Sequence, residues 1–188
     1  MTDRIKKFHT IGCCGIDCGL CPRFHTKGNS ACPGCGGLDF KDKHPSCGFL
    51  TCCAIKDGLE VCSECKDYPC SRFDSELKGY DSFVTHQKVF DNLNSIKSKG
   101  IDFFIENQKE RIDILNDLLG NFDDGRSKSF FCICSALLPL ENLQQAHQEM
   151  HQLIDSIGIK EKNKRIKDHF QTVAINKSID LRLNKKRK

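Results

Sequence analysis

Twelve of the chain's fourteen cysteines lie between Cys13 and Cys70, and this crowding constrains the fold more than any other feature of the sequence. Short spacings recur in the runs Cys14-x3-Cys18-x2-Cys21, Cys32-x2-Cys35 and Cys62-x2-Cys65-x4-Cys70. A spacing of two residues lets both thiolates bind one ion from a single tight turn. Because that spacing occurs several times in one short segment, the pattern predicts bound metal.

The segment up to about residue 75 has few large aliphatic side chains and many Cys, Gly and Pro residues. Such a segment cannot bury enough apolar surface to fold alone, so it needs disulfides or metal ions as staples. Residues 1–10 are charged and polar, without the apolar run of a secretory leader. No stretch approaches the roughly 18 apolar residues of a membrane span. Because disulfide frameworks are rare in reducing compartments, we expect metal staples and a cytoplasmic protein that does not enter a membrane.

The 188-residue chain has a formal net charge of +4, and the charge is unevenly distributed. Residues 158–188 contain eleven Lys and Arg against three Asp and Glu, a balance of +8, so the remainder stands at −4. A basic tail at residues 180–188 can bind an acidic partner or nucleic acid. A solvated terminus explains the same composition, and the sequence identifies no particular partner.

Composition divides the chain into a cysteine-rich module at residues 1–75, an α-helical domain at 76–179 and the basic tail. In the module, recurrent Gly, Pro and Asn residues predict turns, with one brief helix near residues 54–56. Tyr68 and Pro69 are expected to pack over the last cysteine run, because a small metal module needs an aromatic cover.

Beyond residue 75 the pattern of apolar residues becomes helical. Helical spacing occurs in four stretches, at residues 83–96, 101–119, 140–157 and 160–176. Gly100 indicates a helix end, and Pro139 suits the first turn of the helix that follows it. The apolar segment 127–138 fits either a buried helix or a strand.

Five short motifs in the module carry a resemblance to a known family. They are CGIDCGLCP from Cys14, CPGC from Cys32, CA at Cys53, CSEC from Cys62 and KDYPC ending at Cys70. In this order and spacing they resemble the cysteine-rich family named domain of unknown function 3795, over residues 12–75. Cys13 and the Cys52/Cys53 doublet depart from that pattern. The resemblance implies metal binding, whereas the family name implies no activity.

Ten cysteines form the predicted pool of metal ligands: Cys14, Cys18, Cys21, Cys32, Cys35, Cys47, Cys53, Cys62, Cys65 and Cys70. Four thiolates suit one tetrahedral zinc ion, so ten suit two sites with two left over, or three sites if histidines join. His9, His25 and His44 are candidate helpers, although each is more typical of a surface histidine. Which four cysteines share an ion stays open, because cysteine runs can pair with non-adjacent runs. Cys13 and Cys52 are left as spares.

An iron–sulfur cluster is the alternative cofactor. Cys14-x3-Cys18-x2-Cys21 is the spacing with which three cysteines hold a cubane cluster, but the radical enzymes that use it need a barrel longer than this chain. Cys21-Pro22 and Cys32-Pro33 echo the cysteine–proline step of ferredoxins, whereas the rest of the spacing differs. We therefore expect Zn²⁺.

Three further features lie outside the module. His147 and His151 share one helix face at a metal-ligand spacing, but the protease motif H-E-x-x-H is absent, so a structural role is expected. Cys132 and Cys134 are expected to be inert buried cysteines, with a nucleophilic or redox thiol as the alternative. The loop at residues 123–126 is expected to form a turn and helix cap, with anion or partner binding as the alternative.

These patterns predict a small metal-stapled, irregular Cys-rich module followed by an α-helical C-terminal domain. All-cysteine zinc sites are closed and structural, so binding or scaffolding with an unknown partner is predicted rather than catalysis. An iron–sulfur redox protein, in which Cys132 or Cys134 adds a redox thiol, is the alternative. An enzyme with a site between module and helical domain is a third possibility, although the sequence contains no glycine-rich nucleotide loop and no recognisable serine–histidine–acid set.

Overall fold

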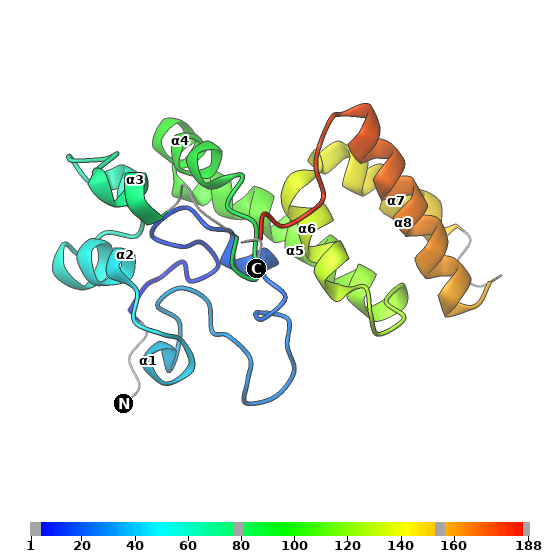
Figure 1. Ribbon diagram of the computed structural model, residues 1–188, viewed down its shortest axis with the longest axis horizontal. Coiled ribbons are helices and arrows are strands. Elements are labelled where there is room, and N and C mark those ends of the chain that lie inside the picture. The colour runs from blue at the N-terminus through cyan, green and yellow to red at the C-terminus, as the bar shows by residue number, and fades with distance from the viewer. Residues whose placement is uncertain (1–4, 77–80, 153–156, 186–188) are drawn as a thin grey trace. The chain divides into compact units, whose positions relative to one another are not determined.

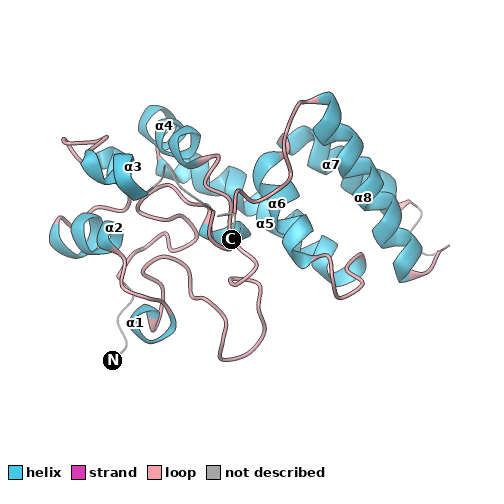
Figure 2. Ribbon diagram, viewed as in Figure 1, coloured by secondary structure: helices cyan, strands magenta, loops and turns pink. Residues whose placement is uncertain are grey.

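The computed structural model describes residues 5–76, 81–152 and 157–185, and within these ranges it contains helices and loops but no strand (Figure 1, Figure 2). The prediction of a cysteine-rich N-terminal region and a helical remainder is confirmed to that extent. The chain forms two compact units, one of Met1–Gln108 with Leu183–Lys188 and the other of Lys109–Arg182. The division falls inside helix α5 (Ile101–Asn121), whereas the composition of the chain changes near residue 75.

The cysteine-rich part of the first unit consists of loops and short helical turns. They are 3-10 turns at Cys18–Leu20 and Cys62–Glu64, α1 (Phe40–Lys43), α2 (Gly48–Leu50), a π-helical segment at Thr51–Lys56 and α3 (Ser71–Glu76). The helix expected near residues 54–56 is confirmed as the end of the π-helical segment. Gly34 shows why glycines recur here, because its φ is 80° and a Cβ would lie 2.2 Å from the His9 carbonyl oxygen.

One hydrophobic core holds the cysteine-rich loops and the helix that follows them together. Its buried aliphatic and aromatic members are Ile11, Phe40, Phe49, Leu50, Val61, Phe73, Val89, Leu93 and Ile96, and the cysteines Cys13, Cys14, Cys35, Cys53 and Cys62 are buried among them. Ile101, Phe104 and Ile105 of α5 pack against this cluster. The loops therefore obtain apolar surface from α4 (Val89–Lys99) and from the start of α5, which their own composition cannot supply.

The first cysteine run lies directly against α4 at Gly15. A Cβ at this position would lie 2.6 Å from the Val89 carbonyl oxygen and 2.7 Å from Cγ of Leu93. The Asn92 side-chain amide donates to the Gly15 carbonyl at 2.9 Å. With φ at +90°, Gly15 meets both a steric and a conformational requirement for glycine.

Helix α4 begins later than the apolar spacing predicts. The stripe from residue 83 includes Phe83 and Phe90, but α4 starts at Val89 and these two rings are 58% and 47% exposed. The Asp81 carboxylate accepts the His86 amide at 2.8 Å, which holds the preceding residues in a turn. The predicted end of the helix at Gly100 is confirmed, and the glycine there has φ 89°.

The second unit is built from the rest of α5 with α6 (Lys128–Leu137), α7 (Leu140–His151) and α8 (Ile159–Asn176). Segment 127–138, which fits a helix or a strand by sequence, is therefore mostly helix. Pro139 immediately precedes α7, as predicted. The core of this unit includes Leu115, Leu118, Phe122, Phe131, Leu138, Leu143, Ile166 and Phe170, all fully buried. The stretch predicted to continue α7 to residue 157 runs partly through residues 153–156, which lie outside the described residues.

The C-terminal segment returns to the first unit. The Asp81 amide donates to the Asn184 carbonyl at 2.8 Å, and the Asn184 amide donates to Oδ2 of Asp81 at 2.8 Å. Lys185 Nζ donates to the carbonyl oxygens of Asp81 and Ser82. Residues 186–188 of the basic tail lie outside the described residues. Among the helices that the structure describes, none combines the length and the apolar character needed to cross a bilayer.

Asn163 provides a test of the packing of the helical unit. Its amide Nδ2 donates to the Phe122 carbonyl at 2.8 Å, and its Oδ1 accepts from Ser127 Oγ at 3.2 Å, all within the core. Asn163→Ala removes both hydrogen bonds and leaves their buried partner atoms without the amide. We therefore expect a loss of about 2 kcal/mol in the free energy of unfolding. Urea titration of the helical circular dichroism measures it, with the exposed Asn176→Ala as control on the same helix. Equal losses in the two variants contradict the prediction.

Candidate metal centre

All ten cysteines predicted as ligands lie in the first unit, and each is buried or half-buried. Cys14, Cys35, Cys53 and Cys62 are buried, and Cys18, Cys21, Cys32, Cys47, Cys65 and Cys70 are half-buried. Burial of so many thiols in a segment with few aliphatic side chains makes sulfur a principal component of this core.

A chain of thiols runs through the centre of this unit. Sγ of Cys35 donates to Sγ of Cys13 at 3.9 Å, Cys13 also interacts with Cys53, and Cys53 interacts with Cys62 while its Sγ donates to the Leu59 carbonyl at 3.5 Å. Two sulfurs on one tetrahedral zinc ion lie about 3.8 Å apart, given zinc–sulfur bonds near 2.3 Å. The hydrogen bond from Cys35 acts to lower the pKa of Cys13, but the bond to Cys53 and burial outweigh it and raise that pKa to about 12.

Cys13 is thus a candidate that sequence reasoning left out of the ligand pool. Spacing does not distinguish it from Cys14, because both precede Cys18 by an interval that a ligand can have. In the folded chain both thiols are buried, and the hydrogen bond from Cys35 is what places Cys13 among the candidates.

The remaining cysteines of the early runs also lie near one another. Cys18 interacts electrostatically with Cys35, Cys14 and Cys21, and Cys21 interacts in turn with Cys32. Burial raises the pKa of Cys18 well above its ordinary value, whereas the positive charge of Lys6 acts in the opposite direction. Burial likewise raises the pKa of Cys14 to about 12.

A small cavity is formed by the Cys52/Cys53 doublet and the last cysteine run. Its volume is about 30 Å³, and its lining includes Cys52, Cys53, Cys62, Cys65 and Cys70. Tyr68 and Phe73 also line it, and their rings meet edge-on with centroids 5.1 Å apart. The predicted aromatic cover is therefore confirmed for Tyr68, whereas Pro69 does not line the cavity. Cys52, which spacing alone leaves as a spare, becomes a further candidate ligand.

Lys6 is a buried cation beside these thiols. The residue is only 2% exposed, and its Nζ donates to the Ile11 carbonyl at 2.6 Å. Among the residues described, no carboxylate lies within ion-pair distance of this ammonium group. A buried charge is costly unless an opposite charge or hydrogen bonds compensate it.

The thiols are close in pairs and chains rather than in complete tetrahedral sets. Among the described residues, only Asp117, His147 and His151 place three or more His, Cys, Asp or Glu ligand atoms all within 4.8 Å of one another. The candidate helper histidines make other contacts. Nε2 of His25 lies 2.7 Å from the Gly19 carbonyl oxygen, and His44 stacks on Phe40.

The other candidates lie in the helical unit. Cys132 and Cys134 are both buried in α6, and burial raises the pKa of Cys134. The loop at residues 123–126 forms the expected turn, in which the Asp123 carboxylate accepts the Gly125 amide at 3.0 Å and the Ser127 amide at 2.9 Å. Neither feature needs a ligand to account for its geometry.

Comparison with known proteins identifies one similarity. Residues 10–75 match the model of a family described as a protein of unknown function (DUF3795). No curated protein and no solved structure matches the chain. The matched residues begin just before the first cysteine run and end just after the last one.

Gln108 provides a test of how the first cysteine run is held. Its Nε2 donates to Oδ1 of Asp17 at 2.6 Å and to the Thr10 carbonyl at 3.0 Å, and its side chain is buried. Gln108→Leu leaves both acceptors without this donor, so we expect a loss of about 2 kcal/mol in stability. Chemical denaturation measures it against the exposed Glu106→Ala on the same helix. An unchanged midpoint for Gln108→Leu contradicts the prediction.

Cys134 provides a test of thiol burial in the helical unit. Its raised pKa and full burial predict that iodoacetamide at pH 8 leaves it unmodified in the native protein and modifies it after unfolding. Because the unfolded thiol ionises near pH 9 and the folded one does not, this group also lowers stability as pH rises above about 9. Mass spectrometry of peptides containing Cys134 measures the labelling. Equal labelling rates in native and unfolded protein contradict the prediction.

Proposed function

We propose that the chain, whose residues 10–75 match the DUF3795 family model, is a zinc protein in which cysteine-ligated Zn²⁺ holds the N-terminal region folded. In this proposal the ions are structural, and the protein acts by binding or scaffolding in the cytoplasm. Its ligands come from the ten predicted cysteines together with Cys13 and Cys52.

The cavity lined by five cysteines carries the proposal. A volume of about 30 Å³ exceeds the roughly 10–15 Å³ that one water molecule needs, so the cavity has room for a single small ion. Sulfur is a soft donor that favours zinc over the hard ions calcium and magnesium. In this proposal Cys62, Cys65 and Cys70 supply three ligands and one cysteine of the doublet supplies the fourth, because a structural zinc ion takes four.

The buried ammonium of Lys6 supports the same proposal. Four thiolates around one Zn²⁺ carry a net charge of −2, and a nearby cation compensates that charge. Lys6 acts electrostatically on Cys13, Cys18, Cys35 and Cys53, which come from separate parts of the cysteine-rich segment. If the sulfurs are neutral thiols, this buried ammonium has the neutral Ile11 carbonyl as its hydrogen-bond acceptor and no negative charge from sulfur beside it.

A closed four-thiolate site leaves no position for substrate or water, which is why binding rather than catalysis is proposed. The basic residues of the C-terminal segment fit an acidic partner or nucleic acid. Lys185 already donates to backbone carbonyls in the first unit, so residues beyond it are the ones proposed to meet such a partner.

Metal content tests the proposal. Protein purified under nitrogen is expected to be colourless and to contain zinc bound by cysteine. Cys65→Ser removes one ligand from the cavity and is expected to lose about one zinc ion per chain. At a free zinc concentration a thousandfold above the Kd of the parent site, zinc binding stabilises the parent protein by about 4 kcal/mol. The N-terminal region of Cys65→Ser is expected to lack this stabilisation. Plasma mass spectrometry counts the metal, and thermal melting measures the stability.

Cys134→Ala is the matched control, because Cys134 is buried but lies in α6 outside the cysteine-rich region. It is expected to retain the parent's zinc content. A brown protein with iron and acid-labile sulfide overturns the zinc proposal in favour of an iron–sulfur protein. Full zinc retention in Cys65→Ser excludes that residue as a ligand, and protein without metal overturns the proposal as a whole.

A further inference from the structure

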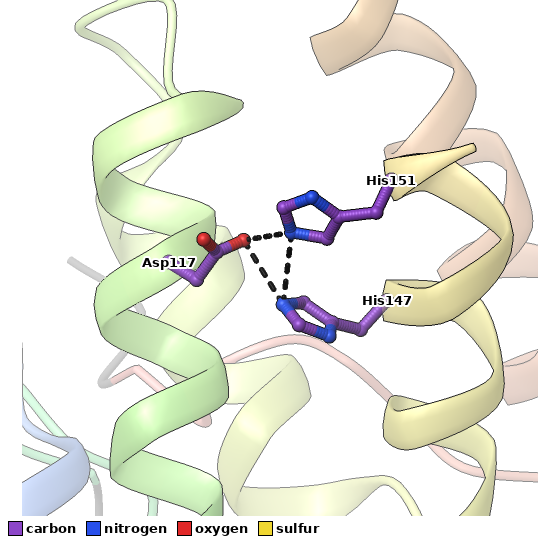
Figure 3. A group of neighbouring side chains, drawn as sticks. All are labelled: Asp117, His147 and His151. Atoms are coloured by element: carbon purple, nitrogen blue, oxygen red, sulfur yellow. Dashed lines mark hydrogen bonds and ion pairs between the residues drawn. The ribbon is translucent and has the colours of Figure 1, made fainter. Parts of the chain in front are cut away.

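Three ligand-type side chains converge between α5 and α7 in the helical unit (Figure 3). Oδ2 of Asp117 lies 3.0 Å from Nε2 of His147 and 2.7 Å from Nε2 of His151. The two Nε2 atoms lie 3.1 Å apart. Each of the three atoms therefore contacts the other two.

Hydrogen bonding alone does not satisfy this triangle. Each Nε2 carries at most one hydrogen, so at most two hydrogens serve three contacts. If both hydrogens point to Asp117, the two N–H groups face each other across 3.1 Å. If one hydrogen joins the two rings, a lone pair of the other nitrogen faces the carboxylate oxygen. A cation bound by all three lone pairs removes this conflict.

The triangle has the size that a transition-metal ion requires. The three atoms lie on a circle of about 1.7 Å radius, so a point about 1.2 Å off their plane is about 2.1 Å from each. That distance is the length of zinc bonds to imidazole nitrogen and carboxylate oxygen. Tetrahedral bonds of that length place ligand atoms about 3.4 Å apart, so each pair of atoms would move apart by less than about 1 Å to coordinate a tetrahedral ion.

Neighbouring contacts hold the ligands in place. Oδ1 of Asp117 accepts the Asn121 side-chain amide at 2.8 Å, which leaves Oδ2 directed at the histidines. The Phe122 ring, fully buried, meets the His151 ring edge-on with centroids 5.6 Å apart. Partners that orient ligands in this way are a general feature of metal sites in proteins.

We propose that Asp117, His147 and His151 bind one divalent first-row transition-metal ion, with zinc as the test ion. Two imidazoles and one carboxylate suit such ions better than they suit calcium or magnesium. Three protein ligands leave at least one coordination position for water or another small ligand. The three side chains are 25–35% exposed, so an ion enters from solvent. The site is independent of the cysteine-rich region in sequence and in donor chemistry.

Histidine nitrogen chemical shifts test the proposal on the full-length protein. Long-range proton–nitrogen spectra of ¹⁵N-histidine protein are recorded before and after one equivalent of Zn²⁺ is added. We expect Nε2 of His147 and His151 to move together to metal-bound positions with 1:1 saturation, or to be there already in protein as purified. This readout is local to each histidine, so zinc on cysteines does not affect it.

Asp117→Asn and His151→Gln are expected to weaken zinc binding at this site at least about 100-fold, since loss of even an outer partner commonly costs 10–100-fold. His169→Gln is the matched control, because His169 lies on α8 and faces Glu149 at 3.5 Å instead. It is expected to leave the affinity unchanged. Nε2 shifts that stay at metal-free positions in the parent protein at tenfold excess zinc overturn the proposal. Equal responses at His169 overturn it as well, because they indicate nonspecific surface binding.

Discussion

The contact between Gly15 and α4 is the constraint on which the first unit depends. Only a residue without a Cβ brings the first cysteine run against Val89 and Leu93, and the Asn92 amide holds the run there. This contact places the loops on the apolar face of α4, so the buried surface they lack is supplied by a neighbouring helix. The cysteine-rich region is therefore not folded by its own residues alone, whether or not metal is bound.

The core of the first unit contains buried cysteine thiols and, beside them, the buried ammonium group of Lys6. The thiols of Cys14 and Cys18 have raised pKa values because burial disfavours the thiolate, yet the Lys6 ammonium is buried beside them. Neutral thiols offer the Lys6 ammonium no opposite charge, whereas four thiolates bound to one Zn²⁺ would offer it a net negative charge. The buried lysine is consequently the feature of this core that an apolar packing argument does not explain, and the proposed zinc sites account for it.

The helical unit is proposed to bind metal by different chemistry. Thiolates in the first unit suit a closed, structural ion, whereas two imidazoles and a carboxylate leave coordination positions open. The proposed cysteine sites draw on several runs of the N-terminal region, whereas Asp117 and the histidines come from helices α5 and α7. The family match ends at residue 75, so it covers only the first of these two chemistries.

The sequence by itself determined the local structure: the turns of the cysteine runs, the helix end at Gly100, the helix start after Pro139, and the shared face of His147 and His151. These depend on spacing and backbone preference within a few residues. It did not determine that segment 127–138 is helical, because a short apolar run fits either structure. Only the tertiary structure decided that Cys13 joins the thiol chain, that Lys6 is buried and that Asp117 meets the histidines. Each of these depends on residues brought together from distant parts of the chain, and sequence periodicity carries no information about such contacts.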